Sequence, residues 1–241
     1  MGRSVFRSLL LGSWVAVAAS SCAVSPQPEP PSIAAETISI LLDSDTLVRV
    51  VGEPGTVSPA GATVTIRNLD SAVEPSLPVE VASDADGGFV AIVPGMPAEV
   101  FRLQALSGDV RSRPLDLMGG APGPARPFRR PLDDCFLIGG ESVVDLGVVA
   151  VGDVQSARVE MENRCPVEVV VEGVFARMGA PGVFAMAGAP PVRIASGTTR
   201  FFIVTFAPLE PGPVETIVDV MVGPPMPHPR PITVVGLGVT E

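Results

Sequence analysis

The chain has 241 residues and a formal net charge of −10, with 46% apolar and only 17% charged residues. The apolar content supports a packed core, the length allows one large or two small domains, and the acidic balance argues against nucleic acid as a partner. The 25 glycines and 27 prolines have no period, which excludes collagen. The chain is also rich in valine and shows no long helical pattern. Together with the frequent glycines and prolines, these features predict an all-β chain of short strands joined by turns.

Residues 1–21 have the layout of a secretory signal. Arg3 and Arg7 precede an apolar run of about eleven residues from Leu9 to Ala19, and small residues follow. This run is shorter than the roughly 20 apolar residues that a transmembrane helix needs. We therefore expect export and no integral membrane span.

Cys22 follows the apolar run, and two interpretations of it remain open. The small residues Ala16 and Ala18 suit an ordinary signal peptidase, which would leave Cys22 as a plain residue. Residues 19–22, ASSC, resemble the bacterial lipobox, in which the cysteine is acylated and becomes the new N-terminus. This resemblance implies a lipoprotein anchored in a membrane through palmitate-type chains on Cys22. By resemblance to lipoprotein sorting in Gram-negative bacteria, Ala23 rather than Asp after the cysteine implies the outer membrane, on its periplasmic or its surface side.

Residues 22–35 are polar and proline-rich, and we interpret them as an extended tether that joins no core. Polyproline geometry rises about 3 Å per residue, so such a tether holds a domain roughly 30–40 Å from a surface. A spacer directly after Cys22 suits a lipid-anchored protein. It therefore favours lipidation over ordinary cleavage.

Residues 36–117 alternate short apolar runs with turn residues, as expected for a β-sandwich. The stretches GEPGTVSPAGATVTIRN and SDADGGFVAIVP resemble bacterial immunoglobulin-like or carboxypeptidase-regulatory-like domains. Asp84 and Asp86 in the second stretch invite a calcium interpretation, but two carboxylates do not make a full ligand set. We interpret them as part of a hairpin turn and expect no metal and no cofactor.

Residues 118–131 are dominated by glycine, proline and arginine and show no periodicity. We interpret them as a semi-rigid linker between two domains. Arg126, Arg129 and Arg130 form the only basic cluster, which a solvated linker explains as well as a nucleic-acid site does.

Residues 132–241 contain about seven strand-like runs in roughly 105 residues, the size of an immunoglobulin-like sandwich. Several motifs in order resemble the Hydin-type immunoglobulin-like domains, the ASH group that includes choice-of-anchor D domains and is related to major sperm protein and PapD-type chaperones. These motifs are DLGVVAVG at 145–152, Asn163 at the end of a strand, SG at 196–197, VTFAP at 204–208 and GLG at 236–238. Together with the resemblance of residues 36–117, this resemblance implies an all-β chain in which two tandem immunoglobulin-like β-sandwiches follow the signal peptide.

Cys135 and Cys165 are the remaining cysteines. Cys135 lies just before the first expected strand of the second sandwich, and Cys165 lies in the turn after the second, so both are placed at one end. An exported chain retains disulfides, and a bridge closing a loop of about 30 residues contributes about 3 kcal/mol. Two thiols alone do not make a structural zinc site. We predict a disulfide; the alternative is two separate buried thiols.

No arrangement in the sequence points to catalysis. The chain has no lysine, and its one histidine, His228, lies in a proline-rich stretch that we interpret as a hairpin loop. We therefore expect no enzyme activity. The favoured function is a lipid-anchored, non-catalytic binding or scaffold module of the cell envelope, with an unidentified envelope or surface protein as its partner.

Two alternative functions remain open. One is a passive structural spacer, and the other is an accessory carbohydrate-binding module. The second alternative needs exposed aromatic rings, whereas the chain has no tyrosine and its one tryptophan, Trp14, lies in the signal.

Overall fold

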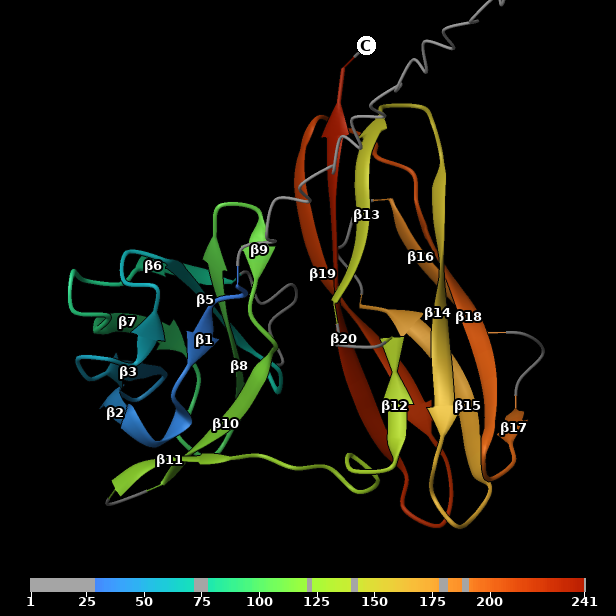
Figure 1. The fold of residues 1–241 in the computed structure, drawn as a ribbon, viewed down its shortest axis with the longest axis horizontal. Coiled ribbons are helices and arrows are strands. Elements are labelled where there is room, and N and C mark those ends of the chain that lie inside the picture. Colours follow the sequence, from blue (N-terminus) through green and yellow to red (C-terminus); the bar gives the residue numbers. More distant parts are fainter. Residues whose placement is uncertain are drawn as a thin grey trace, which may run out of the picture.

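The protein folds into two β-sandwiches that lie side by side (Figure 1). A computed structural model describes residues 29–71, 78–120, 123–139, 143–177, 182–187 and 191–240. Nearly all regular structure in these residues is β-strand, which confirms the prediction of an all-β sandwich fold.

The first sandwich packs the sheet β11-β10-β8-β5-β6 against the sheet β2-β3-β7, and the short pair β1-β4 lies beside them. Its apolar residues alternate as a half-buried strand requires: Phe89, Ala91 and Val93 on β7 are buried and the residues between them are exposed. Its strands are β1 (Ser32–Ile33), β2 (Ile38–Ser44), β3 (Leu47–Gly52), β4 (Val57–Ser58), β5 (Thr63–Asn68), β6 (Val79–Ala82), β7 (Phe89–Pro94), β8 (Val100–Ser107), β9 (Val110–Arg111), β10 (Leu115–Gly120) and β11 (Gly123–Pro127).

Strand β8 departs from this alternation because both of its faces are buried from Val100 to Ala105. Phe101, Leu103 and Ala105 belong to the core of the first sandwich. Arg102 and Gln104, which lie between them, are on the outer face, and there Arg102 contacts Pro231 of the second sandwich. This strand therefore connects the core of one domain to the junction between the two.

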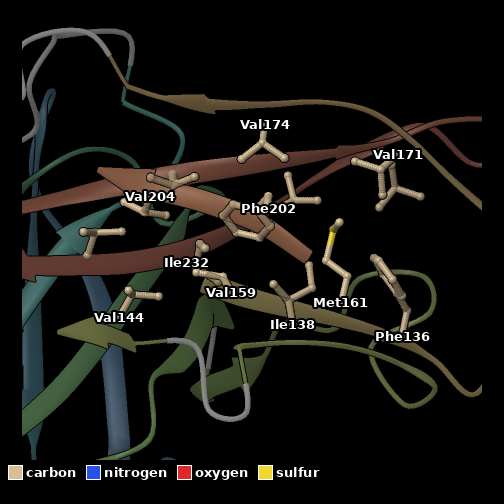
Figure 2. Close-up of a cluster of buried hydrophobic side chains, with 14 of the residues drawn as sticks. Phe136, Ile138, Val144, Val159, Met161, Val171, Val174, Phe202, Val204 and Ile232 are labelled. Atoms are coloured by element: carbon tan, nitrogen blue, oxygen red, sulfur yellow. The ribbon is translucent and has the colours of Figure 1, made fainter. Parts of the chain in front are cut away.

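The second sandwich packs the sheet β12-β14-β18-β16 against the sheet β13-β20-β19-β15-β17, in which β13 runs parallel to β20. Phe136, Met161 and Phe202 from the first of these sheets lie in its core, with Val171 and Ile232 from the other (Figure 2). The strands are β12 (Phe136–Ile138), β13 (Val143–Ala150), β14 (Gln155–Asn163), β15 (Val169–Ala176), β16 (Val183–Ala187), β17 (Val192–Ile194), β18 (Thr198–Phe206), β19 (Gly212–Val222) and β20 (His228–Val239).

The expected linker at 118–131 needs correction. The stretch 118–131 is not a linker throughout, because β10 continues to Gly120 and β11 pairs with it as far as Pro127. Its prolines are tolerated there because β11 is an edge strand, where a missing N–H breaks no ladder. The chain that joins the sandwiches is thus shorter than predicted.

The described end of the tether also differs from the prediction. Pro31 is buried, Ser32–Ile33 form β1 against β4, and Ile33 packs against the first core. In the part of the second sandwich that the structure describes, there are two more strands than the seven expected. Both extra strands, β12 and β17, have three residues and are too short to show an alternating pattern.

Candidate functional site

Cys22, the predicted lipidation site, lies outside the described residues. Acylation of this cysteine and ordinary cleavage before it both remain predictions. Within the part of the chain that the structure describes, no helix has both the length and the apolar character to cross a membrane.

Cys135 and Cys165 form a disulfide at one end of the second sandwich, with their Cα atoms 4.8 Å apart. Cys135 immediately precedes β12 and Cys165 follows β14, and these two strands pair with each other. The amide of Arg164 also donates to the carbonyl oxygen of Cys135 at 2.8 Å. The bridge therefore fixes a three-residue edge strand onto its neighbour.

Asn163 holds the same end of the sandwich from within. Its fully buried side chain donates from Nδ2 to the carbonyl oxygens of Val167 and Ile194, each at 2.8 Å. Its Oδ1 accepts a bond from the Cys165 amide at 2.9 Å. The side chain thus satisfies three backbone groups that would otherwise be buried without partners.

The main polar site lies at the junction, where the outer face of β5-β8-β10 meets β19 and β20. Arg67 Nη2 donates to the carbonyl oxygen of Glu215 at 3.3 Å and lies 3.4 Å from its Oε1. Arg111 Nη1 binds the other carboxylate oxygen of Glu215 at 3.1 Å. Arg102 Nη1 donates to the carbonyl oxygen of Pro231 at 3.0 Å. Three arginines of the first sandwich therefore reach across to the second.

One arginine crosses in the other direction. Arg177 of the second sandwich donates from Nη1 to the carbonyl oxygen of Leu69 at 2.9 Å. Its Nε and Nη2 hold the Asp219 carboxylate at 2.8 and 3.2 Å. Because the Asp219 carboxylate fixes the plane of the Arg177 guanidinium, Nη1 is held in position to bind the first sandwich.

A small apolar cluster closes the junction between these ion pairs. Leu69 and Val100 from the first sandwich and Ile217 from the second are buried together, with Met118 and Phe128 packed against them. Apolar contacts and ion pairs thus stabilise the same interface between the two sandwiches. This combination favours one relative orientation of the two sandwiches.

Asp116, like Glu215, is shared by two arginines at the junction. Arg102 binds it through Nε and Nη2 at 2.8 and 2.9 Å, and Arg130 Nη1 binds it at 2.6 Å. Burial raises the pKa of the Asp116 carboxyl, but the charges and hydrogen bonds of Arg102 and Arg130 outweigh this effect and hold the pKa below its ordinary value of 3.8. Asp116 therefore stays ionised and anchors two guanidinium groups.

Sequence reasoning missed this junction because its arginines alternate with apolar residues on β5 and β8. That pattern is typical of a solvent-facing strand surface. One signal was available: every basic residue of the chain is arginine. Arginine is favoured over lysine in buried, bidentate ion pairs.

A second candidate surface is the outer face of β14-β18-β16. Phe201 and Ile203 on β18 and Phe184 on β16 are 46%, 42% and 62% exposed. The Arg158 guanidinium lies 3.8 Å from the centre of the Phe201 ring. β16 is an edge strand of this sheet, paired only with β18 in the described residues. An aromatic face next to an edge strand can bind a polypeptide.

The other residues singled out from the sequence make local hydrogen bonds in turns and at strand ends. Asp86 Oδ1 accepts a bond from the Gly88 amide at 3.1 Å in a tight turn. This turn is not the hairpin that we expected, because β6 before it and β7 after it belong to different sheets. His228 is not in a loop but begins β20, and its Nδ1 donates to the Met226 carbonyl oxygen at 2.6 Å. In the described ranges, no three His, Cys, Asp or Glu side chains gather where they could hold a metal ion.

No family model matches the sequence, and no curated protein matches it. Solved structures do resemble the fold. An ASH/PapD-like domain of human CEP192 matches at 15% identity and a TM-score of 0.37, covering 48% of this chain and 93% of that domain. A Porphyromonas gingivalis protein of unknown function matches at 12% identity and a TM-score of 0.35, covering 87% of this chain and all of that one.

The VesB protease of Vibrio cholerae is also among the similar structures. It matches at 11% identity and a TM-score of 0.38, over 74% of this chain and 63% of the protease chain. The fold class given above rests on the strand pairing within this chain.

Proposed function

We propose that the chain is a lipid-anchored, non-catalytic binding protein of the cell envelope that recognises a protein partner through the outer face of β14-β18-β16. The observation that carries the proposal is the exposed group of Phe201, Ile203 and Phe184 beside the edge of β16. Aromatic side chains and arginine are enriched where protein interfaces are fully buried, and Arg158 already stacks on Phe201.

The charge of the chain restricts the chemistry of the partner. The chain carries a net charge of −10, and Glu160 lies opposite Phe201 in the register of β14 and β18. We therefore expect a partner whose contact surface combines apolar and basic side chains. A partner strand that pairs with β16 would add main-chain hydrogen bonds to these contacts.

Anchoring is the other half of the proposal, and Cys22 is its residue. A segment with the layout of a secretory signal, a lipobox-like stretch and a proline-rich spacer support it. Radiolabelled palmitate should enter the wild-type chain and not the Cys22→Ser variant. Equal labelling of both chains would end the lipoprotein half of the proposal without touching the binding half.

Cross-linking on intact cells, followed by affinity capture, tests the binding half. The double variant Phe201→Thr/Ile203→Thr keeps residues that favour strands but removes the apolar face. We expect it to lose a partner that the wild type captures. Leu209→Thr, which alters an exposed apolar residue outside the strands, should keep that partner. Capture that survives in the double variant would contradict the role of this face. Failure of the wild type to capture any defined partner would favour the passive-spacer alternative.

A further inference from the structure

A cavity of about 330 Å³ lies between the two sandwiches and the chain segment that joins them. Its wall takes Arg102 and Asp116 from the first sandwich and Arg230 from the second. Arg129, whose side chain is 74% exposed, marks the mouth of the cavity. The cavity is therefore open to solvent at one side and lined by buried charges at the other.

The charged side chains that line this cavity are unbalanced. Four are cationic and two are anionic: Arg102, Arg129, Arg130, Arg230, Asp116 and Asp133. Asp134, which lies outside the lining, binds Arg129 Nη1 at 3.1 Å, so one positive charge remains in excess when this pair is counted, although the whole chain has a net charge of −10. Such a local excess attracts small anions even when the protein as a whole is acidic.

Arg230 shows where an acceptor is missing. Its Nε binds Asp133 Oδ1 at 3.1 Å, whereas its buried Nη1 has no hydrogen-bond partner among the described residues. Burial lowers the pKa of Arg230, the nearby Arg130 and Arg102 charges lower it further, and Asp133 opposes them. A buried guanidinium with an unused donor and two cationic neighbours is stabilised by an added anion.

We propose that this cavity binds a dianionic oxyanion of the phosphate-monoester type. The negative charge of such a group offsets the cationic excess of the site and gives the buried Nη1 of Arg230 an acceptor. Guanidinium forks match the oxygens of a phosphate group, and the apolar side chains of Phe128 and Pro231 would contact the group that the phosphate carries. This site is separate from the β14-β18-β16 face and goes beyond the binding role proposed for that face.

Isothermal titration calorimetry of the full chain with inorganic phosphate, at fixed ionic strength, tests the proposal. The wild type should show saturable binding. Arg129→Gln should weaken it about tenfold, since it removes one charged hydrogen-bond donor at the mouth. Arg193→Gln is the matched control, because Arg193 is also exposed and paired with a carboxylate, that of Glu168, but lies away from the cavity. It should leave the affinity unchanged.

The phosphate group could belong to a free metabolite or to a lipid. Flotation of the Cys22→Ser chain with phosphatidate vesicles, compared with neutral phosphatidylcholine vesicles, separates these two sources. Selective flotation that Arg129→Gln weakens would identify a headgroup. Phosphate binding without flotation would identify a soluble ligand. Absence of saturable heat in the wild type, or equal weakening by Arg129→Gln and Arg193→Gln, would overturn the proposal.

Discussion

Asn163 and the Cys135–Cys165 disulfide stabilise the same end of the second sandwich by different means. The disulfide ties β12 to the end of β14, whereas the buried amide of Asn163 satisfies backbone groups of three segments that meet there. The resemblance drawn from the sequence included an asparagine at this strand end. The structure shows why an asparagine is suited to this position: its side chain makes three hydrogen bonds. Two of them reach Val167 and Ile194, whose proximity to Asn163 the sequence did not reveal.

We predict that Asn163→Ala lowers the free energy of unfolding by about 3 kcal/mol, because it leaves buried backbone donors and acceptors without partners. Gln155→Ala, at the exposed start of the same strand, should change it by less than about 0.5 kcal/mol. Denaturant unfolding followed by circular dichroism measures both values, since the chain lacks tyrosine and its one tryptophan, Trp14, lies in the predicted signal. Equal stability of the two variants would contradict the assigned role of Asn163.

At the scale of elements, the close packing of β20 against its neighbours explains the Gly-x-Gly motif near the C-terminus. A Cβ on Gly236 would lie 2.8 Å from the ring of Phe206, and a Cβ on Gly238 would lie 2.5 Å from the carbonyl oxygen of Glu210. Both glycines therefore let β20 approach its neighbours closely, while Leu237 between them points outward.

We predict that Gly238→Ala destabilises the protein by about 1–3 kcal/mol, since the turn at Glu210 must move to admit the methyl group. Leu237→Ala changes the neighbouring, partly exposed residue and should have a smaller effect. The midpoint of thermal unfolding distinguishes the two variants. A larger decrease in the unfolding midpoint for Leu237→Ala would contradict the idea that the glycines are needed for the close approach of β20 to its neighbours.

At the scale of the whole molecule, the junction makes the two sandwiches one structural unit. Arg67, Arg102 and Arg111 reach from the first sandwich, Arg177 reaches from the second, and an apolar cluster lies among them. These contacts bury ion pairs whose separation would leave charges unpaired. The protein therefore carries its candidate binding face at a fixed orientation to the first sandwich.

We predict that Asp116→Asn lowers the free energy of unfolding at pH 7 by about 3–5 kcal/mol, because two guanidinium groups lose their buried carboxylate. The pKa of Asp116 in the folded chain lies below its ordinary value of 3.8. The wild type therefore keeps this contribution above about pH 5 and loses it as the pH falls through 3.8 towards the folded-state pKa. Denaturant unfolding between pH 7 and pH 3 should show the wild type and the variant converging at low pH. A constant difference would contradict this account.

The sequence predicted the all-β class, because the alternation of apolar and polar residues along strands such as β14 can be recognised within a single strand. It placed the linker too early, since glycine and proline in 118–127 suggest a loop even when an edge strand tolerates them. It did not reveal the junction. Arg67 and Arg102 have the spacing of surface residues, and only the second sandwich makes their surface an interior.

Site-specific photo-cross-linking on intact cells tests most directly the central claim that the β14-β18-β16 face recognises a protein. A photoreactive residue in place of Phe184 should give one defined adduct. The same residue in place of Phe175, an equally exposed phenylalanine on the other sheet, should give none; the two side chains are 62% and 59% exposed. Matching adducts from both positions, or an adduct from Phe175 alone, would contradict the claim.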